Sequence, residues 1–465
     1  MTFVFYDTET TGLDAAFDQI LQFAAIVTDD AFNTIEELNL RCRLQPHIVP
    51  SPGAIRITRV GPQAIQAAPL SWYEMVNAIR KFIDRWTPAI FIGFNSVDFD
   101  ERMLRGALYQ TLHPVYLTNT NGNSRMCVLR LAHAVAEYQP DAINVPLNED
   151  GRPSFKLGGL IKANGLALDQ AHEALADTRA TMALARYLKE RASAVWDQVY
   201  ACRSRGGVED LLKNNDVVLL TNRAFTKPTI LAGLITRHPK NPASLAFFDL
   251  EYDPAPFLDV DQEQALALLT SSPRPIRVMR ANALPILSPY RPDSNAGVDL
   301  ATAREHLARI RAHPTFAGTI ARAMAAQYAD KEMSPHVENR IYDGFPSPGD
   351  QRLMDEFHNA PWGVRYAIAR GFRDDRFREL AERLVFSESP DALPDDRRAA
   401  LDTWRRERLT TTDKAPWLSL SRARTELADL KEGMSPDDAA LLIEVELHLD
   451  ELTAAITGPS VANPA

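Results

Sequence analysis

The chain has 465 residues, of which 45% are hydrophobic and 24% charged, and its formal net charge is −10 at pH 7. This composition excludes a disordered chain, and the length predicts about three domains rather than one core. The negative charge argues mildly against a nucleic-acid protein, although an enzyme needs only a local positive channel.

The first expected strand covers residues 3–9, where an apolar run leads into Asp7-Thr8-Glu9 and a Thr-Thr-Gly turn. Side chains alternate along a strand, so Asp7 and Glu9 share one face and Thr8 lies on the other. Two adjacent carboxylates repel each other unless a proton or a cation lies between them. Taken alone, such a pair is more often a solvated strand end, so further acids are needed to predict a metal site.

Two later segments supply such acids. Residues 89–95 read as a buried strand, and an apolar helical pattern follows from Asp100, for which a capping aspartate is the ordinary interpretation. Asp177 opens another helix, and His172 precedes it by five residues. Positions five apart on a helix are about 140° from each other, so His172 is expected in the preceding loop or first turn, where it can lean over the site. Hard oxygen ligands of this kind bind Mg²⁺ or Mn²⁺, and a nearby histidine can deprotonate a water.

The secondary-structure pattern expected from the sequence changes along the chain. Residues 1–190 alternate strands with helices, which predicts a mixed α/β domain around a central sheet. Residues 191–207 read as a hinge-like transition. Short β-type runs and proline-rich turns over 208–295 predict a small β-barrel-like domain with one inserted helix. The pattern is helical over 299–457, and a disordered tail is expected over 458–465.

Neither a membrane anchor nor an export signal is expected. No apolar run of about 18 residues occurs, and the N-terminus enters a strand without a basic-apolar leader. The three cysteines (Cys42, Cys127 and Cys202) are far apart and lack metal-type spacing. We therefore expect free thiols in a cytoplasmic protein.

The order of these motifs is that of a known family. Asp7 to Gly12, then Asn95 to Asp100, then His172 to Asp177 together resemble the histidine-containing branch of the DEDD exonuclease superfamily. Six further segments are similar to bacterial exonuclease I: Gln22–Ile26, Pro52–Thr58, Pro153–Leu157, Lys162–Gly165, His238–Asn241 and Tyr342–Phe345. This resemblance covers essentially the whole chain. It implies a ribonuclease-H-like α/β catalytic domain and a processive 3′→5′ exonuclease that degrades single-stranded DNA to 5′-mononucleotides in repair and recombination.

The resemblance also implies a site. Asp7, Glu9, Asp100 and Asp177 would hold two Mg²⁺ ions, with Mn²⁺ as a substitute, and His172 would be the general base. Contacts to the DNA strand are implied for Glu9, Arg105, Tyr116, Phe155 and Lys156. His238, Arg277 and Tyr342 are candidates to line the groove that the later domains would close over the strand, although a structural role is an equally good interpretation of each.

Some of these assignments have an alternative. Stacking on Phe155 and Tyr116 would contribute roughly 1–3 kcal/mol per base, but packing in the core is an equally good interpretation of both. Three positions depart from the pattern of exonuclease I: Thr8 stands between the two acids, and His133 and Gln139 stand where arginine is expected. These departures imply a weaker grip on the strand or a shifted partner contact. None of the five catalytic positions departs.

Partners are implied as well: single-stranded DNA, enclosed by a monomer, and the C-terminal tail of single-stranded-DNA-binding protein. Arginines are abundant over 365–408, but the interleaved acids favour a salt-bridged helix surface over a DNA track. Two other functions are open. A 3′→5′ exoribonuclease of the same superfamily is disfavoured by the long accessory region. A catalytically silent single-strand-binding scaffold is disfavoured because no ligand is missing.

Overall fold

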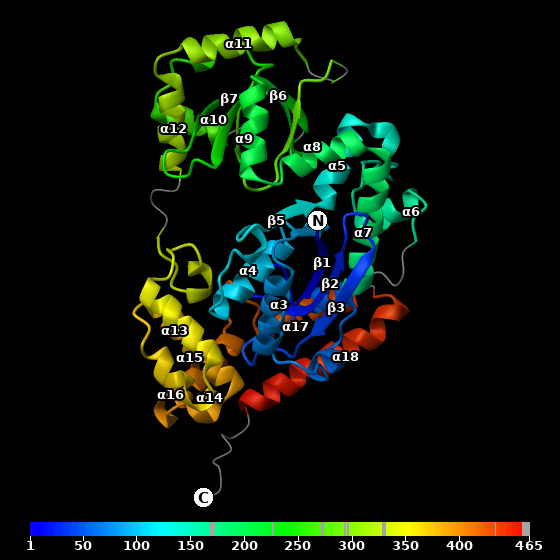
Figure 1. Ribbon diagram of the computed structural model, residues 1–465. Coiled ribbons are helices and arrows are strands. Elements are labelled where there is room, and N and C mark those ends of the chain that lie inside the picture. The colour runs from blue at the N-terminus through cyan, green and yellow to red at the C-terminus, as the bar shows by residue number, and fades with distance from the viewer. Residues whose placement is uncertain are drawn as a thin grey trace, which may run out of the picture.

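The computed structural model describes residues 1–167, 173–225, 227–270, 274–292, 294, 297–327, 332–432 and 434–457. His172 and the predicted tail over 458–465 lie outside these residues. The described chain builds two five-stranded sheets and a group of helices near the C-terminus (Figure 1). None of the described helices combines the length and apolar character needed to cross a membrane.

The first sheet has the strand order β3-β2-β1-β4-β5, with β1 in its centre. Its strands are β1 (Phe3–Thr10), β2 (Ile20–Thr28), β3 (Thr34–Arg41), β4 (Ile90–Gly93) and β5 (Ser124–Cys127). β2 is antiparallel to both β1 and β3, whereas β4 is parallel to β1 and β5, so the predicted mixed sheet is confirmed. β4 pairs with β1 from Phe3 to Phe5 and so stops before Asp7 is reached.

Helices cover both faces of this sheet. Phe3 and Phe5 pack with α5 (Val128–Tyr138) and α7 (Ala174–Arg191), whereas Val4 and Tyr6 pack with α3 (Trp72–Trp86) and α4 (Asp100–Gln110). Because side chains alternate along β1, its later acids project from the α7 face. Three shorter helices complete the domain: α1 (Pro52–Thr58), α2 (Pro62–Gln66) and α6 (Leu157–Ala163).

The second sheet is antiparallel and has the order β10-β6-β7-β8-β9. Its strands are β6 (Val217–Thr221), β7 (Thr229–Arg237), β8 (Ser244–Asp249), β9 (Ile276–Arg280) and β10 (Ile286–Pro289). The predicted barrel is not confirmed: within the described residues, β9 and β10 are the two edges and do not pair. Helices cover the two faces of this open sheet.

Five helices accompany the second sheet: α8 (Ser193–Ala201), α9 (Arg205–Asn214), α10 (Gln262–Thr270), α11 (Leu300–Ala312) and α12 (Phe316–Ala326). α9 packs on one face of the sheet, and α10, α11 and α12 pack on the other. Residues 191–207, read from the sequence as a hinge-like transition, contain α8 and the start of α9, and α8 contacts α5 and α7 as well as β10. Residues 299–327 also pack with the second sheet, which favours a domain boundary after α12.

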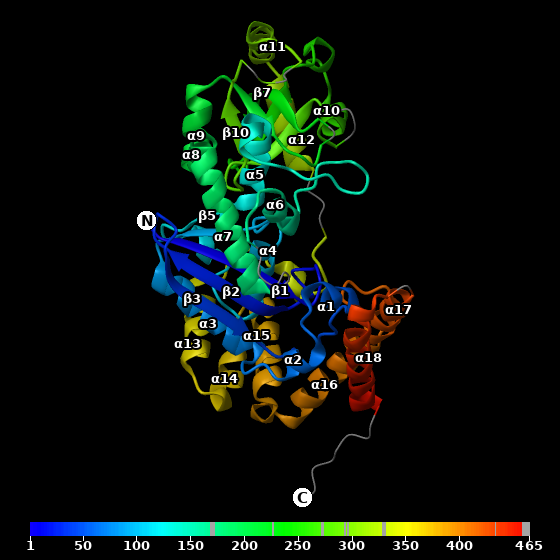
Figure 2. The ribbon, with the colours of Figure 1, turned by 90° about the vertical axis from the view of Figure 1, so that its right-hand side faces the viewer.

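The remaining helices flank the first sheet (Figure 2). They are α13 (Pro348–Asn359), α14 (Trp362–Ala369), α15 (Asp375–Glu388), α16 (Asp395–Thr410), α17 (Leu420–Lys431) and α18 (Pro436–Thr457). The helices α13 to α16 share a core with α3 and α4. The helices α17 and α18 pack against α1, and α18 also contacts α2. The C-terminal helices are thus bound to the sheet domain on the side away from α7.

Candidate metal centre and strand-binding cavities

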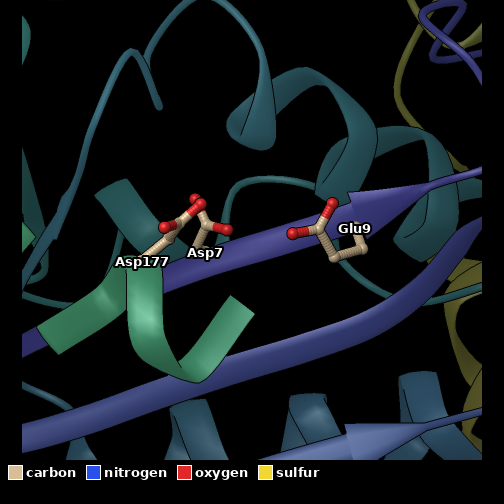
Figure 3. Close-up of side chains that lie close together, drawn as sticks. All are labelled: Asp7, Glu9 and Asp177. Atoms are coloured by element: carbon tan, nitrogen blue, oxygen red, sulfur yellow. The ribbon is translucent and has the colours of Figure 1, made fainter. Parts of the chain in front are cut away.

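Three carboxylates meet where β1 ends (Figure 3). Asp7 and Glu9 project from β1, and Asp177 comes from the first turn of α7. One oxygen from each carboxylate lies within 4.8 Å of the other two. A set of hard oxygen donors at this separation suits a divalent cation such as Mg²⁺, which carboxylates bind through oxygen. We call these three residues the carboxylate cluster.

The electrostatics of the cluster also favour a cation. Burial raises the pKa of Asp7 well above its ordinary value, and the neighbouring charges of Asp100, Glu9 and Asp177 raise it further. Burial and the charges of Asp177 and Asp100 raise the pKa of Glu9 to about 8, although Arg41 opposes the shift. So much negative charge in one place is unfavourable unless protons or a metal neutralise it.

Asp100 lies beside the cluster rather than within it. It is the first residue of α4, after the N-cap residue Phe99, and is 3% exposed. Its Oδ1 accepts a hydrogen bond from Thr8 Oγ1 at 2.6 Å, so it approaches β1 from the α4 face. Burial raises the pKa of Asp100 to about 6, although hydrogen bonds from Thr8 lower it. The N-cap interpretation of Asp100 is wrong, and Thr8, noted as a departure, holds this acid in place.

Two further glutamates lie near these acids, Glu101 beside Asp100 and Glu173 near Asp7 and Glu9, and neither was predicted from the sequence. Glu101 is 1% exposed and accepts hydrogen bonds from Tyr6 Oη at 2.8 Å, Thr118 Oγ1 at 2.7 Å and Arg125 Nη1 at 3.0 Å. It thereby joins β1 to the start of α4. Glu173 is the N-cap residue of α7 and follows His172 directly. Their only sequence signal is that each lies close to a predicted catalytic residue.

Three of the predicted strand contacts line one cavity of about 830 Å³. They are Phe155, His238 and Arg277. His238 Nδ1 accepts hydrogen bonds from the backbone N–H groups of Lys240 and Asn241, which leaves Nε2 as its donor. Arg277 is 8% exposed and donates to the carbonyl of Lys227, so it also stabilises its own domain. The lining also contains five basic or aromatic residues that were not predicted as strand contacts: Arg130, Arg223, Phe225, Arg274 and Arg280.

The ring of Phe155 has a neutral histidine and a charged arginine as neighbours in this cavity. The ring of His133 meets the ring of Phe155 edge-on at 4.5 Å, and burial lowers the pKa of His133 to about 4, so this histidine is neutral. The guanidinium of Arg223 lies 4.6 Å from the centre of the same ring. A cation from the loop between β6 and β7 therefore lies beside Phe155, next to His133, where the resemblance to exonuclease I implied an arginine. Gln139, the other departure, donates a hydrogen bond to the carbonyl of Arg191.

Tyr116 and Tyr342 line a second cavity, of about 470 Å³, between the first sheet's domain and the C-terminal helices. Tyr342 is 64% exposed, and Phe345 beside it is 82% exposed, with its ring centre 6.3 Å from that of Tyr116. The guanidinium of Arg105 lies 5.1 Å from the Tyr116 ring. Arg105 and Lys156 are not among the described residues that line either cavity, and Lys156 is exposed at the start of α6.

The chain matches two family models. Residues 4–185 match the model described as Exonuclease, and residues 335–452 match the model described as Exonuclease I C-terminal domain. The chain is 29% identical to exodeoxyribonuclease I of Escherichia coli over 376 residues, which cover 76% of this chain and 78% of the relative. It is 28% identical to exodeoxyribonuclease I of Haemophilus influenzae over 404 residues, which cover 82% and 84%.

Solved structures of exonuclease I have a similar fold along nearly the whole length of this chain. Exonuclease I of E. coli in complex with a dA16 oligonucleotide has a TM-score of 0.88 to this chain at 26% identity, covering 97% of this chain and 99% of that one. A complex described as SSB and exonuclease I with an inhibitor gives a TM-score of 0.86 at the same identity and coverage.

The mixed sheet with acids at the end of its central strand, in a domain that matches the exonuclease model, defines a metal-dependent 3′→5′ exonuclease. The second model and the similarity along the chain narrow this class further. The chain is a homologue of exodeoxyribonuclease I and is similar to it along most of its length.

Proposed function

We propose that this enzyme removes 5′-mononucleotides one after another from the 3′ end of single-stranded DNA, in repair and recombination. The carboxylate cluster is the observation that carries the proposal, because it lies in the part of the chain that matches the exonuclease model. Two basic and aromatic cavities beside the sheet offer rings and cations to an unpaired strand.

The residues of the site would have different roles in the hydrolysis. Asp7, Glu9 and Asp177 would hold divalent cations, with Asp100 as the fourth acid. Two such cations supply a more acidic attacking water and stabilise the charge on the departing 3′ oxygen. His172 would accept the proton of that water. In each cycle one water is consumed and one P–O bond to the 3′ oxygen is broken.

The proposal also includes the metal ion, the oligomeric state, the cellular compartment and the partners. Mg²⁺ is the proposed ion, because carboxylate oxygens with open water positions suit it. The enzyme would act as a monomer in the cytoplasm. Its relatives include exonuclease I bound to an oligonucleotide and a complex with SSB, so we propose a single DNA strand and the single-stranded-DNA-binding protein as its partners.

A digest of a 5′-labelled single strand tests the proposed reaction. With Mg²⁺ the label should pass into ever shorter strands while mononucleotides accumulate, and a chelator should stop both. Release of internal fragments, or unchanged activity with chelator, would contradict it.

A matched pair of DNA and RNA strands tests the choice of substrate. The exoribonuclease alternative predicts faster shortening of the RNA. We expect the DNA strand to be shortened at least about tenfold faster, because the similarity to exodeoxyribonuclease I extends far beyond the catalytic domain.

His172→Ala tests the proposed base. General-base catalysis typically contributes about 10²–10⁴-fold, so kcat should fall by that factor while strand binding is kept. Because the loss of a base is partly replaced by hydroxide, the remaining rate should rise with pH more steeply than that of the wild type. A variant with the wild-type rate and pH profile would refute the assignment.

A further inference from the structure

Helix α7 is joined to the sheet by a side chain outside the carboxylate cluster. Glu173 caps α7, and its Oε2 accepts a hydrogen bond from the backbone N–H of Ala176 at 3.0 Å. Its Oε1 accepts hydrogen bonds from Gln22 Nε2 at 2.6 Å and Asn39 Nδ2 at 3.1 Å. Arg41 Nη2 lies 3.5 Å from the same oxygen. Both oxygens of Glu173 are therefore engaged by protein donors, which distinguishes it from a metal ligand.

The residues that donate to Glu173 are at strand positions paired, across the sheet, with positions of the carboxylate cluster. Gln22 pairs with Glu9 between β1 and β2, and with Arg41 between β2 and β3. Asn39 is two residues before Arg41 on β3, so both project from one face. Glu173 therefore rests on β2 and β3, on the face from which Glu9 projects.

Glu173 and Asp177 are four positions apart along α7, so they lie on one face of the helix, roughly 6 Å apart along its axis. One acid meets β2 and β3, and the other meets β1. A rotation or shift of the first turn that moved Asp177 away from Asp7 would also break the hydrogen bonds at Glu173. The two contacts fix the same turn at two points.

We propose that Glu173 is a positioning residue for hydrolysis, which holds the first turn of α7 on β2 and β3 and so keeps Asp177 against Asp7 and Glu9. The inference rests on the proposed function of the carboxylate cluster as a divalent-metal site. Groups that orient metal ligands typically contribute about 10–100-fold to metal affinity or activity. The loss of the sheet contact should have an effect of this size.

Glu173→Asp separates positioning from capping. Aspartate is a strong N-cap residue and keeps the charge, but its shorter side chain cannot accept from Gln22 and Asn39 while it caps the helix. We expect the affinity of the full chain for Mn²⁺, measured by titration calorimetry, to fall by about tenfold. The value of kcat should fall by a similar factor while KM for the strand is unchanged. Asn39→Ala, at an exposed position, should lower Mn²⁺ affinity by a smaller factor.

Asp299→Ala is the matched control. Asp299 caps α11 by accepting from the backbone N–H of Thr302 at 2.8 Å, and α11 packs on the second sheet. This variant should lose thermal stability but keep the Mn²⁺ affinity and kcat of the wild type. Wild-type values for Glu173→Asp would overturn the positioning role and leave the proposed function intact. A wild-type chain that does not bind Mn²⁺ would overturn the proposed function itself.

Discussion

Asp7→Asn is expected to lower kcat by about 10³-fold or more and, at the same time, to stabilise the metal-free protein. The loss of activity follows because Asp7 is a member of the carboxylate cluster. Metal-ion catalysis lowers the activation free energy by several kcal/mol, and about 1.4 kcal/mol corresponds to a tenfold change in rate. The gain in stability follows because burial and the charges of Asp100, Glu9 and Asp177 raise the pKa of Asp7. A neutral amide removes that repulsion, and a gain of about 1 kcal/mol is expected in the free energy of unfolding.

The measurement is a pair of assays on the same preparation: strand shortening with Mg²⁺, and urea unfolding with chelator. Asp84→Asn is the control, since Asp84 is 45% exposed on α3, on the opposite face of the sheet, and pairs only with Arg80 among the described ion pairs. It should leave activity unchanged and not raise stability. An Asp7→Asn protein that is inactive but less stable than wild type would indicate a structural acid rather than a site under electrostatic strain.

The local pattern of apolar residues was sufficient to predict most of the helices and strands. The alternation around Asp7 and Glu9 predicted both the strand and the face that carries them, and the structure agrees. The helical pattern expected from residue 299 begins with α11. The short β-type runs expected over 208–295 include β6 to β9. Each of these segments is specified by its own apolar periodicity, which can be read without knowledge of the rest of the chain.

Long-range pairing could not be predicted in this way. Whether β9 meets β10 depends on strand twist and on helices far along the chain, so the same runs fit an open sheet as well as a barrel. The hydrogen bond between Thr8 and Asp100 joins residues 92 positions apart, and that between Gln22 and Glu173 joins residues 151 apart. Sequence pattern identified the acids of the cluster, but not the groups that hold them. His172 lies outside the described residues, so its place over the site stays a prediction.

Glu9 should make the metal-free enzyme lose stability as pH rises from about 6.5 to 8. Its pKa is raised from 4.5 in the unfolded chain to about 8 in the fold. Between these values the folded state binds a proton that the unfolded state does not, so the free energy of unfolding falls as pH rises and levels off above pH 8. One proton corresponds to about 1.4 kcal/mol per pH unit, and the expected loss over the interval is about 1–2 kcal/mol.

Buried histidines change the stability in the opposite direction, so the effect of Glu9 is measured against a Glu9 variant. Burial lowers the pKa of His113 to about 2 and of His358 to about 4, so protonation of these residues in the unfolded chain destabilises the fold as pH falls. At pH 6.5 an unfolded histidine is about half protonated, so the buried histidines add a rising slope up to about pH 7.5, which is the same in the wild type and in Glu9→Gln. Urea unfolding with chelator at pH 6.5, 7.25 and 8 should therefore give a free energy of unfolding that falls in the wild type relative to Glu9→Gln. Saturating Mg²⁺ should remove the fall in the wild type, because the cation binds the charged carboxylates and replaces the proton. Parallel series for the two proteins would mean that Glu9 is already ionised in the metal-free fold, and that the cluster does not need a cation to balance its charge.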